Sequence, residues 1–189
     1  MFDGRDTIVM FDKLAYEDML PVRWCPTSET VSEVAAAQHL VERNLRVLQA
    51  CDALEEHGQL DKSDDESPHS ADLRRLDFKL NLLLDLAGQL VAASQPRLRP
   101  FTIRLNAMGA SFTYDEMLNE GDYGVLEVVL RDIVVQPLNL PAQVVSGAPA
   151  GQMRVRFLSL GELVADHIEK LVFRRHRRKV AGARGIRRT

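Results

Sequence analysis

Few residues of this 189-residue chain stand at spacings that catalysis would need. Ser111 lies in Gly-Ala-Ser-Phe-Thr, one residue short of the Gly-x-Ser-x-Gly elbow of serine hydrolases, and is interpreted as a strand-face serine. His167 is interpreted as a hydrogen-bonded residue at a helix edge, since the five histidines contain no metal-type pair at i, i+4. We cannot assemble an acid, a base and a nucleophile, so we expect a non-enzymatic protein without a cofactor.

One acidic segment has a faint likeness to a calcium loop. Asp61, Ser63 and Asp65 stand at its first, third and fifth positions. Glu66 occupies the sixth position, where the turn requires glycine, and Asp72 occupies the twelfth, where glutamate is expected. We therefore interpret the segment as a solvated acidic loop and expect no metal site.

Charge is distributed unevenly along the chain. Residues 174–189 hold eight of the 24 basic residues and no acidic ones, so the preceding 173 residues carry 16 basic against 27 acidic residues. This basic end could bind nucleic acid, anionic lipid or an acidic partner, or could be a solvated helix end. Two cysteines without a Cys-x-x-Cys motif, no signal-peptide pattern and no apolar stretch of about 18 residues indicate a cytoplasmic protein.

Two long helices are expected in the first half of the chain. Pro26-Thr27-Ser28 is a helix-start signal, and Gly58 is placed to end that helix after His57. Its apolar stripes are wider than one surface helix buries. The second helix is predicted from Pro68 to Ser94, with apolar residues spaced 3, 4, 3, 4, 3 along a heptad seam. The apolar patterns of the two helices predict an oligomer interface. It is formed by Val34, Val41, Leu45, Leu48, Leu73, Leu76, Leu80, Leu83, Ala87 and Leu90.

Strand patterns lie on both sides of these helices. They include MLPVRW at 19–24, residues 101–112, 123–130 and 142–146, and the alternation of Met153, Val155 and Phe157 with arginines. A capping box from Ser159 to Glu162 predicts a last helix. The fold class is therefore α+β: a small antiparallel barrel (1–26 and 96–180) closed by a helix, with a helical pair inserted at 27–95 and a flexible basic tail at 181–189.

The stretch from Phe101 to Lys179 resembles the PilZ domain, a family of bacterial modules best known as receptors for cyclic di-GMP. FTIRLNAMGASFTYDEMLNEGDYGVLEVVL is similar to the family's strand, D/N-x-S-x-x-G turn, strand and E-G-D turn. QMRVRFLSLGELVADHIEKLVFRRHRRK is similar to its last strand, closing helix and arginine-rich end. With MLPVRW as a first strand, the resemblance covers about half of the chain.

The family's ligand motifs are only partly present. The D/N-x-S-x-x-G motif falls on Arg104, Asn106 and Gly109, and only Gly109 matches. In the R-x-x-x-R motif, which precedes the first strand, Arg5 is followed by Val9 at the second position. Binding cyclic di-GMP needs positioned guanidinium groups, so the resemblance implies weak or no binding.

The resemblance therefore implies an atypical PilZ protein whose helices form an oligomer, expected to be a tetramer. We expect an interaction scaffold in the cyclic di-GMP or type IV pilus network. One alternative is a genuine cyclic di-GMP receptor that uses Asn106, Gly109 and arginines near the C-terminus. Another is a nucleic-acid binder that uses residues 174–189.

Overall fold

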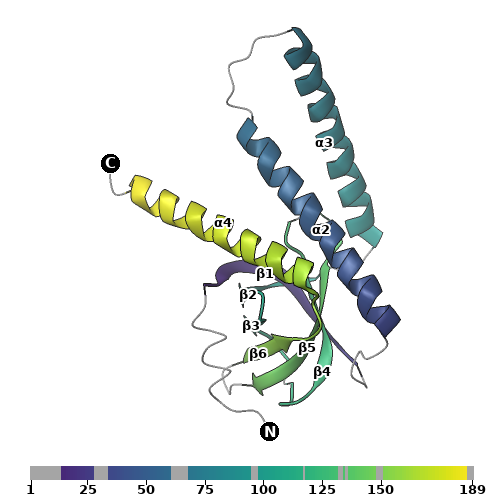
Figure 1. Cartoon of the computed structure of the whole chain (residues 1–189), viewed down its shortest axis with the longest axis vertical. Coiled ribbons are helices and arrows are strands. Elements are labelled where there is room, and N and C mark those ends of the chain that lie inside the picture. The colour runs from purple at the N-terminus through teal and green to yellow at the C-terminus, as the bar shows by residue number, and fades with distance from the viewer. Residues whose placement is uncertain are drawn as a thin grey trace.

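The computed structural model describes residues 14–27, 34–60, 68–94, 98–116, 118–131, 134, 136–147 and 151–186. Six antiparallel strands form a closed barrel in the order β1-β2-β3-β6-β5-β4, and β4 closes the barrel by pairing with β1 (Figure 1). The strands are β1 (Tyr16–Pro26), β2 (Arg99–Leu105), β3 (Gly109–Thr113), β4 (Tyr123–Val128), β5 (Leu138–Gly147) and β6 (Gln152–Phe157). The predicted α+β class, a small antiparallel barrel combined with helices, is confirmed.

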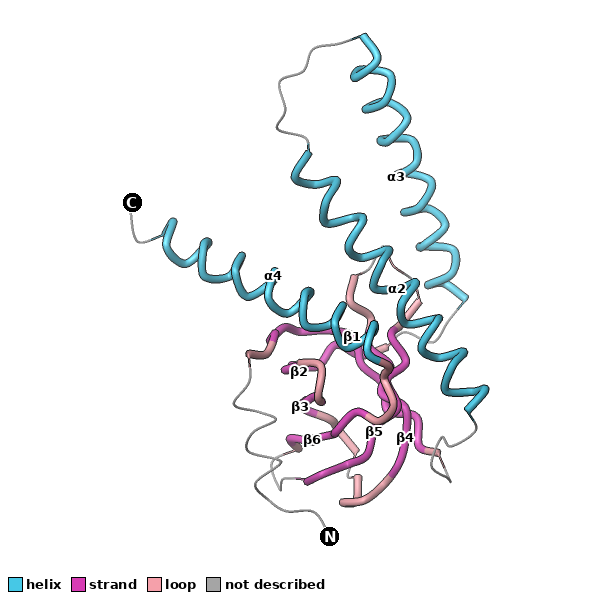
Figure 2. Tube along the Cα trace, in the orientation of Figure 1, coloured by secondary structure: helices cyan, strands magenta, loops and turns pink. Residues whose placement is uncertain are grey.

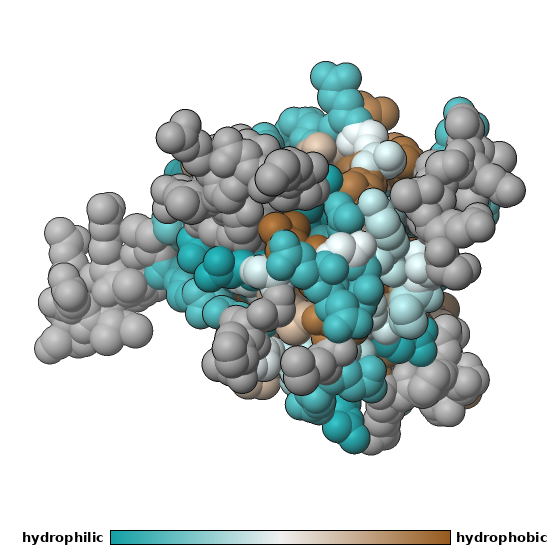
Figure 3. Space-filling model, turned by 90° about the horizontal axis from the view of Figure 1, so that it is seen from below, coloured by the Kyte–Doolittle hydropathy of each residue, from teal (hydrophilic) through white to brown (hydrophobic). Residues whose placement is uncertain are grey.

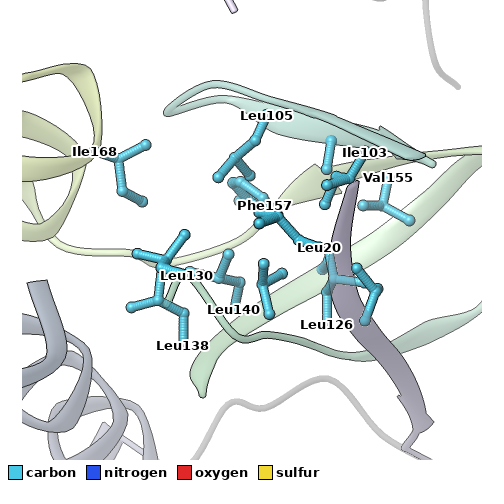
Figure 4. Packing of buried hydrophobic residues seen from close by; sticks show 14 of the residues in the cluster. Leu20, Ile103, Leu105, Leu126, Leu130, Leu138, Leu140, Val155, Phe157 and Ile168 are labelled. Atoms are coloured by element: carbon cyan, nitrogen blue, oxygen red, sulfur yellow. The ribbon is translucent and has the colours of Figure 1, made fainter. Parts of the chain in front are cut away.

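Alternating side chains fill the inside of the barrel. In β6, Met153, Val155 and Phe157 are buried, while Gln152 and Arg154 face solvent. Because successive side chains of a strand point to opposite faces, this pattern places one face inward. Leucine, valine and isoleucine side chains from the other strands meet them in one core (Figure 4).

Helix α4 (Glu162–Ile186) lies across one end of the barrel (Figure 1). Val164, Ile168, Leu171 and Val172 are buried there, whereas Leu163 is 62% exposed. The helix continues to Ile186, so the prediction of a flexible tail from residue 181 is wrong as far as residue 186. Ala181 and Ala183 are strong helix formers, so the single glycine between them, Gly182, weakens the helix without ending it.

The start of α4 differs from the predicted capping box. Ser159 has a φ of 50° and Gly161 a φ of 77°, and the first helical residue is Glu162. Ser159 therefore lies outside the helix, because an N-cap residue takes an extended conformation directly before the first helical position.

Helices α2 (Val34–Leu60) and α3 (Pro68–Ser94) are inserted between β1 and β2 (Figure 2). The bounds of α3 are those predicted from the sequence. Helix α2 runs through Gly58 to Leu60, so that glycine does not end the helix as predicted. The predicted start near Ser28 lies outside the described residues.

Helix α2 packs against the barrel and against α4. Val47, Leu48 and Cys51 are buried in the same core as the barrel strands. Leu48 is 1% exposed and has no surface left for another subunit, so its assignment to an oligomer interface is corrected to the core. Val41 and Leu45 are half-buried against this core, and the Val34 side chain lies outside the described residues.

Candidate functional site

The loop between β2 and β3 carries the degenerate ligand motif. The Oδ1 atom of Asn106 accepts hydrogen bonds from the backbone N–H groups of Met108, at 2.8 Å, and Gly109, at 3.0 Å. The backbone N–H of Asn106 also donates to the Gly109 carbonyl at 3.1 Å. The Asn106 side chain is buried and its oxygen is used to hold the turn. That oxygen is therefore committed to the fold.

Arg104 and Asn106 line different hollows. Asn106 lines an apolar hollow of about 320 Å³ between the β2–β3 loop and α4, together with Met108, Val172 and Phe173. Arg104 is exposed on the outer face of β2 and lines a polar hollow of about 230 Å³. The structure thus does not gather the motif residues into one pocket.

The first arginines near the C-terminus have structural partners. Arg174 forms an ion pair with Asp52. The Arg175 guanidinium donates to the Leu130 carbonyl at 3.3 Å and lies 4.5 Å from the centre of the Tyr16 ring. These contacts join α4 to α2 and to the barrel, so neither arginine is a preformed nucleotide clamp. Arg5 and Val9 lie outside the described residues.

Tyr16 links the N-terminal strand to this region. The pKa of Tyr16 is raised to about 12. The main cause is burial, and the second is the hydrogen bond that its hydroxyl donates to the Asp18 carboxylate. The raised pKa favours the neutral phenol in the folded state, so its stabilising contribution is complete below pH 10 and is lost as the pH rises toward 12.

We expect the wild-type melting temperature to fall more than that of Tyr16→Phe between pH 9.5 and 11.5. Thermal melts of both proteins at the two pH values measure this. A melting temperature that falls equally in wild type and in Tyr16→Phe would contradict the prediction.

Asp52 is the centre of a contact between α2 and α4 that the sequence analysis did not identify. Its carboxylate accepts from His167 Nδ1 at 3.1 Å and also pairs with Arg174. The partly buried carboxylate therefore binds side chains from two different turns of α4. His167 is confirmed as a hydrogen-bonded helix-edge residue. The only sequence signal for this contact was an acidic residue next to the apolar stripes of α2.

Asn44 is a second connection that the sequence analysis missed. It is 1% exposed; its Nδ2 donates to the Asn139 carbonyl at 2.7 Å, and its Oδ1 accepts from the Asn139 backbone N–H at 2.8 Å. Among the described residues, the pairing of β5 with β6 begins only at Ala142. The side-chain amide of Asn44 therefore makes the hydrogen bonds to the backbone of Asn139 that a neighbouring strand would otherwise make. The signal was a polar residue inside an apolar stripe.

Helix α3 presents a large apolar surface. Its leucines lie on the helix outside the barrel core, and the described ones are between 48% and 74% exposed. The seam residues among them are Leu73, Leu76, Leu80, Leu83 and Leu90, and Ala87 is exposed as well. By contrast, the described residues that are visible from below are mainly hydrophilic, with separate hydrophobic patches (Figure 3). An apolar helix surface of this extent indicates an interaction site.

Metal and membrane features are absent from the described part of the chain. Within it, no three His, Cys, Asp or Glu side chains come together as a metal site would require. The Asp61 loop lies outside this part. Among the described helices, none is both long and apolar enough to cross a membrane.

The fold and these contacts define a class of protein: a small closed barrel with a helix across one end and an inserted helix that exposes an apolar surface. Residues 45–185 match the family described as atypical PilZ domain, cyclic di-GMP receptor. The chain belongs to the atypical PilZ domain family, whose members are receptor and signalling domains.

A solved structure extends this likeness to nearly the whole chain. It is a pathogenic protein from Xanthomonas campestris, described as a new tetrameric PilZ domain self-assembled via an unusual helical bundle. The two share 28% sequence identity with a TM-score of 0.72, over 94% of this chain and 96% of the other. No curated protein matches the chain.

Proposed function

We propose that this protein is a non-enzymatic PilZ-type scaffold that assembles through α3, as a tetramer, and binds cyclic di-GMP weakly or not at all. It acts in the cytoplasm, in the cyclic di-GMP or type IV pilus network. The observation that carries the proposal is the heptad seam of α3, whose leucines are at least half exposed in a single chain.

Self-association explains this exposed surface. Burying a leucine side chain contributes about 1.5–3 kcal/mol, and the seam offers five of them per chain. Leu84 and Leu86 lie on opposite flanks of the seam and are 50% and 48% exposed. Two helices would leave both flanks in water, so the broad apolar surface favours a bundle of more than two helices.

The Xanthomonas protein supports the same arrangement. It is a tetramer formed through a helical bundle, and the likeness covers almost all of both chains. The match covers 94% of this chain, so it extends over at least part of α3, the helix that carries the seam. We therefore propose a homotetramer, with α3 as its central element.

The residues of the β2–β3 loop support the proposal that cyclic di-GMP binds weakly or not at all. The family serine is replaced by Asn106, whose side-chain oxygen holds the loop. The family Asp or Asn is replaced by Arg104, which faces a different hollow. Arg174 and Arg175 are held by partners within the fold. Neither Arg174 nor Arg175 is thus preformed to bind the guanine and phosphate groups of cyclic di-GMP.

Titration calorimetry with cyclic di-GMP tests this part of the proposal. We expect no binding tighter than about 100 μM, which corresponds to roughly −5.5 kcal/mol. Micromolar affinity that is lost in Asn106→Ala would contradict it. That result would favour the alternative of a genuine receptor with a non-standard site, which is the activity that the family description gives.

A further inference from the structure

The outer face of the barrel carries a row of polar side chains across four adjacent strands. Glu17 of β1 is opposite Arg104 of β2, Arg104 is opposite Ser111 of β3, and Ser111 is opposite Arg154 of β6. Neighbouring strands lie about 4.8 Å apart, so the two arginine backbones are about 10 Å apart, with a short serine between them. Long guanidinium side chains on either side can therefore lean over that serine.

The burial pattern supports this arrangement. Ala110 and Phe112, the neighbours of Ser111 in β3, are buried inside the barrel, so Ser111 faces outward. It is nevertheless only 7% exposed, which means that flanking side chains cover it. Arg104 and Arg154 are themselves exposed. The serine thus forms the floor of a hollow with an arginine on each side.

The lining of this hollow consists mainly of hydrogen-bond donors. Its volume is about 230 Å³, and it is lined by Glu17, Thr102, Arg104, Ser111, Thr113, Gln152 and Arg154. Among these seven residues, six can donate hydrogen bonds and Glu17 alone is acceptor-only when ionised. The hollow is net positive although residues 1–173 carry 16 basic against 27 acidic residues. Donors and positive charge on an otherwise acidic body favour an anion.

We infer that this hollow, centred on Ser111 between Arg104 and Arg154, binds one phosphate monoester group. A monoester carries a charge of about −1.5 to −2 and three acceptor oxygens, and guanidinium forks bind such oxygens in pairs. The hollow lies below the about 300–1,000 Å³ typical of sites that enclose a drug-sized ligand, so it holds a single group. Arg104 and Arg154 also interact with neighbouring residues, and phosphate competes with those contacts. The inference does not rest on self-association.

Phosphate titration followed by amide NMR tests the site. We expect saturable shifts at Ser111 and its strand neighbours, with a dissociation constant of about 1 mM or tighter for inorganic phosphate. The double variant Arg104→Gln/Arg154→Gln should weaken binding at least tenfold. Glu17→Gln should strengthen it severalfold, because it removes the negative charge from the lining. The matched control is Arg99→Gln, which removes an exposed β2 arginine whose partner is Asp115 and should leave binding unchanged.

Several results would overturn the inference: shifts that do not saturate, equal losses in Arg99→Gln, or no gain in Glu17→Gln. Because Glu17→Gln and Ser111→Ala keep both arginines, they test the site even if the double variant folds poorly; Ser111→Ala should weaken binding severalfold. Parallel titrations with GMP and with phosphoserine identify whether a nucleotide or a phosphorylated side chain supplies the group. Tighter binding of cyclic di-GMP, whose phosphates are diesters, would overturn the monoester assignment.

Discussion

Replacing Leu76 and Leu83 by glutamate is expected to convert the assembled protein into monomers. The two side chains are 56% and 62% exposed in a single chain and stand on the same heptad seam of α3. In an assembled bundle they would be buried, and burying unpaired carboxylates there costs several kcal/mol in total. The same carboxylates are solvated in the monomer, so the change acts on assembly and leaves the barrel folded.

Sedimentation velocity of the double variant at tens of micromolar, next to wild type, measures this effect. The matched control is Asn81→Glu/Gln89→Glu, which adds the same charge to exposed positions of α3 outside the seam. We expect the control to sediment as the wild-type oligomer and the seam variant as a folded monomer. An unchanged oligomer in the seam variant would show that α3 is not the assembly element.

Replacing Asn44 by leucine is expected to lower the free energy of unfolding by about 2–5 kcal/mol, because two buried polar groups lose their partners. The change removes the donor and the acceptor that bind the backbone carbonyl and N–H of Asn139. Both groups lie at the start of β5, where the described pairing with β6 has not yet begun. The loss would also loosen α2, which joins the barrel to α3.

Denaturant unfolding at one fixed protein concentration measures this loss, since assembly makes stability depend on concentration. Gln49→Leu is the matched control, because it removes the same amide group from an exposed position of α2. We expect the control to change stability by less than about 0.5 kcal/mol. Equal losses in the two variants would mean that the contact between Asn44 and Asn139 does not hold α2 on the barrel.

The sequence predicted those parts of the fold whose patterns are local. The spacing along α3 and the proline at its start give its bounds, and the alternation in β6 gives its buried face. The end of α4 was placed too early because glycines near residue 182 weaken a helix without stopping it.

The face that α2 presents to the barrel could not be read from periodicity. Its two apolar stripes fitted either a partner subunit or the chain's own core, and the structure places Leu48 in that core. Periodicity gives the width of an apolar face but does not identify what covers it. The partner of Asn44 is a backbone group 95 residues away in sequence, and no local pattern specifies such a contact.

The candidate site was predictable in its residues but not in its geometry. The sequence placed Arg104, Asn106 and Gly109 at the motif positions. Only the structure separates Arg104 from Asn106 into two hollows and sets Arg104 beside Ser111 and Arg154. Such neighbours come from strands that are distant in the chain, so they depend on the register of the whole barrel.

Light scattering of the wild-type protein during size-exclusion chromatography, at tens of micromolar, tests the central claim most directly. The account predicts a mass of four times the 21.2 kDa chain, with or without cyclic di-GMP. A mass of 21.2 kDa at that concentration would contradict it and would leave the exposed leucines of α3 to a different partner.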